Sequence, residues 1–62
     1  MKVYYEHLIN NQKINNGRTT IKGTRIEPKH IVNYGTIDEI MRDFQLTRNQ
    51  VIEALHYELV KQ

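Results

Sequence analysis

Two stretches near the carboxyl end of the chain place apolar residues at the spacing of one helical face. Positions i, i+3, i+4 and i+7 or i+8 point to the same side of an α-helix. The first stretch contributes Ile37, Ile40, Met41 and Phe44, and the second contributes Val51, Ala54, Leu55 and Leu59. The pattern between Thr36 and Lys61 therefore predicts two amphipathic helices.

Each predicted helix begins with a capping signal. Thr36 precedes Glu39 by three residues, and Thr47 precedes Gln50 by the same distance. In such a capping box each side chain accepts a hydrogen bond from the backbone N–H of the other residue. Only Gln45 and Leu46 remain to connect the helices, so we expect a short turn with Leu46 filling the corner.

Two short helices joined so closely must bury their apolar faces on each other, which is typical of a helix-turn-helix. Arg48 and Asn49 would then face outward from the start of the second helix, where Arg can pair with guanine and Asn with adenine. The same pattern also fits a helix pair that serves packing alone. The outward residues expected here are Thr47, Arg48, Asn49, Gln50, Glu53 and His56.

The amino-terminal part carries a different pattern. Residues 1–16 read as a short strand or extended arm followed by an Asn-rich loop, and residues 17–26 alternate around Gly23, which predicts a small hairpin or bent strand. Pro28 would start a short helix and Gly35 would end it. The sequence thus predicts a mainly α fold in a single domain, residues 1–62, with an arm and hairpin in 1–27 and a three-helix bundle in 28–62.

Charge divides the chain more sharply than its net value of +2 suggests. The part up to Gly35 contains six Lys and Arg residues and two Glu residues. The part from Thr36 onward contains three Lys and Arg residues and five Asp and Glu residues. Phosphate contacts dominate the affinity of proteins for nucleic acids. A nucleic-acid contact would therefore depend on the amino-terminal cations, with Arg18, Lys22 and Arg25 expected to form a basic rim.

The run Ile21-Lys22-Gly23-Thr24-Arg25-Ile26 resembles a motif of the bacterial and phage "domain of unknown function 433" family. Gly17-Arg18-Thr19 before it, Gly35 after the short helix and Thr47 before the last helix also follow the family pattern, although the family usually has Pro at the position of Thr19. The resemblance extends from Leu8 to Val60. It implies a helix-turn-helix, DNA-binding module of the antitoxin type, the partner of a small ribonuclease toxin.

Catalysis and membrane insertion find no support in the sequence. The chain has no Cys and no Ser, and His7, His30 and His56 lack metal-ligand spacing. We therefore expect no enzyme activity, no metal and no cofactor. Because no apolar run reaches about 18 residues and no signal pattern precedes the domain, we expect a cytoplasmic protein.

Two functions remain open. The first is a nucleic-acid-binding regulator, with DNA favoured, which could act as a homodimer and pair with a toxin. The second is an accessory subunit that docks on a larger nucleic-acid enzyme such as a polymerase, primase or helicase, encoded nearby on a bacterial chromosome or mobile element. The residues expected to bind nucleic acid are Arg18, Lys22, Arg25, Lys29, Arg48 and Asn49, and those expected to bind a protein partner are Phe44, Ile52, Glu53, Tyr57 and Glu58.

Overall fold

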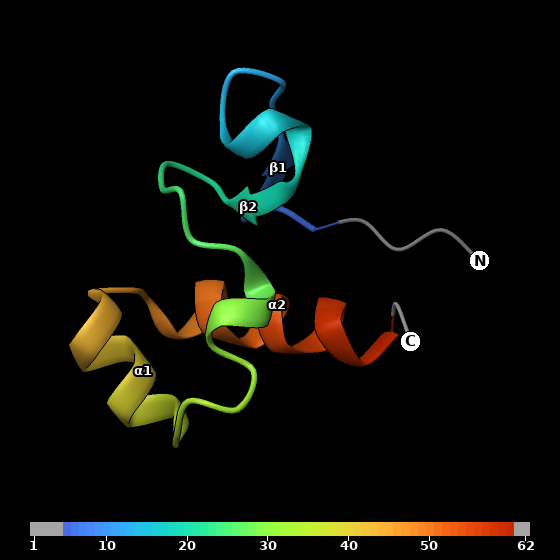
Figure 1. Ribbon diagram of the computed structural model, residues 1–62. Helices are drawn as coiled ribbons and strands as arrows, with labels where there is room; N and C mark the ends of the chain where they lie inside the picture. Colours follow the sequence, from blue (N-terminus) through green and yellow to red (C-terminus); the bar gives the residue numbers. More distant parts are fainter. Residues whose placement is uncertain (1–4, 61–62) are drawn as a thin grey trace.

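The helix pair is present as expected in the computed structural model, which describes residues 5–60 (Figure 1). Helix α1 spans Ile37–Phe44 and helix α2 spans Arg48–Val60. The Glu39 N–H donates to Thr36 Oγ1 at 3.2 Å, and the Thr36 N–H donates to Glu39 Oε1 at 2.9 Å. Thr47 and Gln50 repeat this reciprocal pair at 3.3 and 2.8 Å. Both predicted capping boxes are confirmed.

The turn between the helices is short because Gln45 reverses the chain at once. Gln45 adopts a left-handed conformation with φ of 56°, where glycine is the commonest residue. Its N–H bonds to the carbonyl of Met41, and so does the N–H of Leu46, at 3.1 Å. Leu46 is only 6% exposed and fills the corner between the helices, as the sequence predicted.

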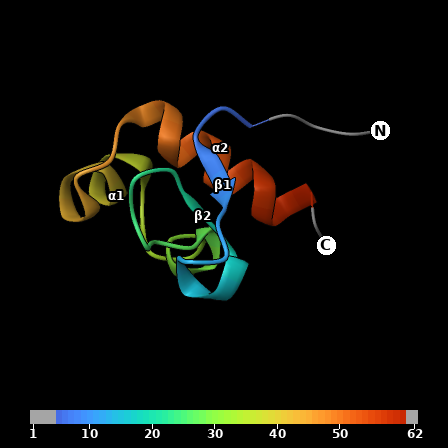
Figure 2. The same cartoon turned by 90° about the horizontal axis from the view of Figure 1, so that it is seen from above.

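A two-stranded antiparallel sheet packs over α2 (Figure 2). Strand β1, Leu8–Asn10, pairs with strand β2, Thr19–Ile21, so that Leu8 faces Ile21 and Asn10 faces Thr19. A single turn of 3₁₀-helix, η1, Asn15–Gly17, lies in the connection. The hairpin therefore closes around residues 11–18. Gly23 does make a tight reversal, with φ of 84°, but the segment after it forms a turn and not a strand.

The prediction of a third α-helix, beginning at Pro28, is wrong. The segment after Pro28 forms one turn of 3₁₀-helix, η2, Pro28–His30, followed by irregular turns. Its backbone bonds join residues three apart, as from the Ile31 N–H to the Pro28 carbonyl at 3.1 Å and from the Tyr34 N–H to the Ile31 carbonyl at 3.1 Å. Few residues separate Pro28 from Gly35, which leaves too little length to repay the cost of nucleating an α-helix. The fold is thus two α-helices with a small sheet, and not a three-helix bundle.

One core joins these elements. Its buried apolar residues come from β2, the turn after η2, α1, the inter-helix turn and α2, and they are Ile21, Ile31, Ile40, Leu46, Val51 and Ala54. Leu59, expected on the inner face of α2, is 71% exposed, whereas Glu58 is 5% exposed. The reason is that Val51, Ala54 and Glu58 define the inner stripe of α2, and Leu59 lies beyond its edge.

No helix in the described part of the chain combines the length and apolar character that crossing a membrane requires. The first four residues of the expected arm and the last two of the expected final helix lie outside the described residues.

Candidate nucleic-acid interface

The first turn of α2 presents polar side chains to solvent. Arg48 and Asn49 are both exposed, and they directly follow the Thr47 cap that fixes where the helix begins. Successive residues of an α-helix are about 100° apart. On that spacing Arg48 and Asn49 belong to one exposed stripe, about 120° wide, that continues along α2 through Ile52, His56, Leu59 and Val60.

The Gly23 turn supplies two more exposed cations, Lys22 and Arg25. The turn is held by the N–H and hydroxyl of Thr24, which both donate to the Ile21 carbonyl, at 2.9 and 2.8 Å. A Cβ atom added at Gly23 would meet no atom of a non-neighbouring residue within 4 Å, so there is open space on that side of the turn. Along the axis shared by Figures 1 and 2, this turn lies at the end where α2 begins.

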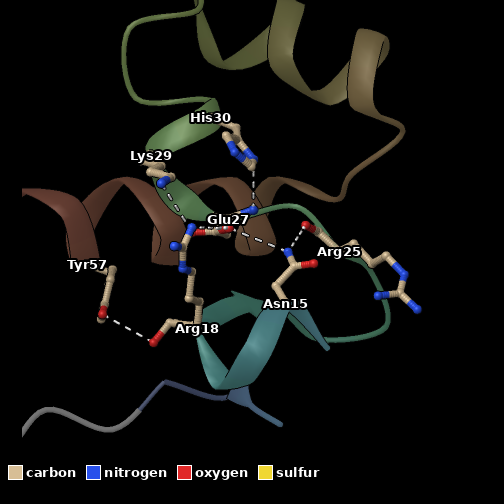
Figure 3. Close-up of polar contacts among 8 residues, drawn as sticks. Asn15, Arg18, Arg25, Glu27, Lys29, His30 and Tyr57 are labelled. Carbon is tan, nitrogen blue, oxygen red and sulfur yellow. Dashed lines mark hydrogen bonds and ion pairs between the residues drawn. The ribbon is translucent and has the colours of Figure 1, made fainter. Parts of the chain in front are cut away.

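Arg18 and Lys29 are placed differently, because both stand beside the carboxylate of Glu27 (Figure 3). The Arg18 guanidinium lies 3.9 Å and the Lys29 ammonium 3.7 Å from Glu27, whose side chain is 12% exposed. Asn15 donates to the same carboxylate at 3.5 Å and to the Arg25 carbonyl at 2.8 Å. The charges of Arg18 and Lys29 are thus partly compensated inside the chain.

Arg18, Glu27 and Lys29 line an open pocket of about 370 Å³. Its walls are tied together at Thr19, whose hydroxyl accepts from Asn10 Nδ2 at 2.7 Å and from the Tyr57 hydroxyl at 3.2 Å. Tyr57 and Glu58 belong to the last turns of α2, about 14 Å along the helix from Arg48. The six predicted nucleic-acid residues therefore divide into three pairs: Arg18 and Lys29 beside this pocket, Arg48 and Asn49 on the first turn of α2, and Lys22 and Arg25 on the separate Gly23 turn.

A comparison with protein-family models matched residues 9–57 to the family described as "Protein of unknown function (DUF433)". The chain belongs to the DUF433 family. The match runs from β1 almost to the end of α2 and includes the Gly23 turn and both capping boxes, so the resemblance seen in the sequence is confirmed. Comparisons with curated proteins and with solved structures gave no match.

The residues expected to bind a protein partner do not gather on one face of this DUF433 protein. Ile52 is 43% exposed, whereas Phe44 is half-buried and packs edge-to-face on Tyr34, with 4.8 Å between the ring centres. Tyr57 turns its hydroxyl to Thr19, and Glu58 lies in the interior. Of the five, Ile52 alone is exposed.

Glu53 is bound by His7 from the opposite part of the chain. The His7 N–H donates to Glu53 Oε1 at 2.9 Å, and the ring Nδ1 of His7 contacts Oε2. Burial alone would raise the pKa of the Glu53 carboxyl, but the hydrogen bonds and charge of His7 outweigh it, and the net pKa lies below the ordinary value. Tyr5 adds a bond from its hydroxyl to His56 Nδ1 at 2.8 Å. Sequence reasoning missed these contacts because 46 and 51 residues separate the partners.

Asp43 has local partners. The Tyr34 hydroxyl donates to it at 2.7 Å and the Arg42 Nε–H at 3.1 Å. These bonds lower the pKa of Asp43, and the bond to Asp43 raises the pKa of Tyr34. Within residues 5–60 no group of three His, Asp or Glu side chains is arranged to hold a metal ion.

Proposed function

We propose that this chain is a small, non-enzymatic helix-turn-helix module that binds DNA and regulates transcription in the manner of an antitoxin. The observation that supports this best is the location of exposed Arg48 and Asn49 on the first turn of α2, with the exposed cations of the Gly23 turn level with that first turn along the axis shared by Figures 1 and 2.

In this proposal α2 reads bases and the Gly23 turn contacts the backbone. The recognition helix of a helix-turn-helix contacts base edges through residues near its amino terminus. Lys22 and Arg25 would bind phosphates and set the register of α2 without reading sequence. Arg18 and Lys29 contribute less, since the Glu27 carboxylate that they share partly offsets their charge.

The first test measures how binding depends on salt, using fluorescence anisotropy with a fluorescein-labelled 20-base-pair duplex of mixed sequence. Two phosphate contacts, from Lys22 and Arg25, give an expected slope of log K against log salt of about −2. Lys13→Ala, which removes an exposed cation from the loop between β1 and η1, is the matched control and should leave the slope close to that of the unmodified chain. At about 20 mM salt, charges are screened only weakly. The absence of binding under that condition would overturn the proposal.

The second test separates reading from anchoring, and it uses the DNA upstream of the chain's own gene beside the mixed-sequence duplex. Arg48→Ala should cost about 1–3 kcal/mol on the upstream DNA and less on the mixed sequence, because a base contact discriminates. Lys22→Ala should weaken both equally. Equal losses for Arg48→Ala on the two duplexes would remove α2 as the reader.

The accessory-subunit alternative gains no support from the placement of its acidic residues. It requires Glu53 and Glu58 on a docking surface, but Glu53 is bound by His7 and Glu58 is 5% exposed. A toxin partner, which the family resemblance implies, and a cytoplasmic location remain parts of the proposal.

A further inference from the structure

The exposed stripe of α2 changes character along its length. Its first turn carries Arg48 and Asn49, whereas its remaining part carries three large apolar side chains with His56 among them. Ile52 is 43% exposed, Leu59 71% and Val60 54%. This apolar stripe, defined by Ile52, His56, Leu59 and Val60, is not used by the proposed DNA contact.

The other faces of α2 are already occupied. Helix α1, the η2 turn and strand β1 all pack against α2 (Figures 1 and 2). The buried residues of α2 are Val51, Ala54 and Glu58. Within residues 5–60 the apolar stripe is therefore the part of α2 that faces solvent beyond the polar first turn. Large apolar side chains that share one helix face indicate an interaction surface.

The charges around the stripe favour a second copy of this chain as the occupant. None of its four residues carries a fixed charge. The neighbouring carboxylate of Glu53 is bound by His7, and Nδ1 of His56 is bonded to the Tyr5 hydroxyl. Two identical faces can therefore meet without like-charge repulsion, whereas a charged partner would find no complementary group on the stripe.

We propose that two copies pair through this stripe, with their α2 helices antiparallel about a twofold axis near His56. A twofold interface joins the same patch on both chains. With His56 opposite its copy, Ile52 of each chain lies opposite Val60 of the other, so the ends of the stripe cover each other. The two Arg48 residues are then about 24 Å apart along the helix direction, outside the contact. The pairing leaves the polar first turn of each α2 accessible.

The interface is small, so the dimer dissociates in the micromolar range. Sedimentation of the full chain without DNA, from about 5 µM to 1 mM to bracket that range, should show the mass rising from monomer to dimer. Leu59→Glu should weaken association at least about tenfold, because it places a charge in the apolar contact. Asn49→Glu makes the same charge change on the same exposed stripe but outside the paired region, and it should leave association unchanged.

A cysteine variant tests the axis without depending on an introduced charge, and the natural chain contains no Cys to confuse it. His56→Cys should form a disulfide-linked dimer on mild oxidation, whereas Arg42→Cys, exposed on α1, should not form one at a comparable rate. A folded chain that stays monomeric at 1 mM overturns the proposal and leaves the stripe to a different protein. So does a dimer that Leu59→Glu does not weaken, or equal crosslinking of the two cysteine variants. Because no DNA is present, these outcomes are independent of the proposed DNA binding.

Discussion

The helix pair, residues 36–60, and the amino-terminal segment, residues 5–30, are held in the fold by different interactions. In the helix pair, buried Ile40, Leu46, Val51 and Ala54 pack together, and local capping boxes fix where the helices start. The amino-terminal segment adds Ile21 to the buried core, packs the partly buried Leu8 and Ile26 against it, and is also attached to α2 through polar side chains.

Helix α2 serves both parts through different residues. Val51 and Ala54 belong to the apolar core, whereas Glu53 and Tyr57 bond to His7 and Thr19 of the amino-terminal segment. Apolar packing depends on size and burial, and polar contacts depend also on protonation. Core substitutions should therefore destabilise the whole fold, while substitutions in the polar contacts should act on the position of the hairpin.

The largest effect should come from the core of the helix pair. Ile40 is 1% exposed, and Ile40→Ala should lower the free energy of unfolding by about 2–5 kcal/mol, through lost apolar contact and the cavity left behind. A chain of this length has a total stability of only about 3–9 kcal/mol. Urea denaturation followed by circular dichroism should show the variant partly or fully unfolded.

Ile40→Val is the matched control, because it removes one methylene and should cost only about 0.5–1.5 kcal/mol. A loss for Ile40→Ala no greater than that for Ile40→Val would contradict the packing described for the helix pair.

A smaller effect of opposite sign is expected in strand β2. Thr20 is fully buried, and its hydroxyl has no hydrogen-bond partner among residues 5–60. Thr20→Val keeps the shape and removes the unpaired polar group, so it should stabilise the fold by about 1 kcal/mol in urea denaturation. Thr19→Val, next to it, removes a hydroxyl that Asn10 and Tyr57 both use and should destabilise it. Destabilisation by both variants would mean that the Thr20 hydroxyl is satisfied.

The same contrast explains how much of the fold the sequence could predict. The helix pair was predictable because its signals are local: Thr36 and Glu39 are three residues apart, and the apolar spacing repeats within each helix. The pairing of Leu8–Asn10 with Thr19–Ile21 was not predictable. Nothing in the sequence around Gly23 indicates that the strand before it pairs with an earlier segment of the chain and not with the segment after the turn. Pro28 and Gly35 gave helix signals that were too close together to enclose an α-helix.

The candidate site was predictable to a similar degree. Exposure of Arg48 and Asn49 follows from the Thr47 cap and the helical spacing. The interior position of Glu58 and the exposure of Leu59 do not, because they depend on which face of α2 the hairpin and η2 cover. The contacts of Arg18 and Lys29 with Glu27 likewise require the chain to bring separate turns together.

The smallest predicted effect concerns the pH dependence of the contact between Glu53 and His7. The folded protein holds the pKa of Glu53 below its ordinary value of 4.5, so the unfolded chain binds more protons between the two values. The stabilisation is therefore fully present above about pH 4.5, the ordinary value, and is lost as the pH falls through the folded pKa. Glu53→Gln removes this titration, and its stability should depend less steeply on pH in that window than that of the unmodified chain, as measured by urea denaturation.

Glu39→Gln is an informative companion, because the pKa of Glu39 is also lowered, by its bonds to Thr36 in the helix pair. Hydrogen exchange should separate the two: Glu53→Gln should increase exchange in β1 with α1 unaffected, and Glu39→Gln should do the reverse. Equal exchange in β1 for both variants would show that His7 and Glu53 do not hold the hairpin on α2.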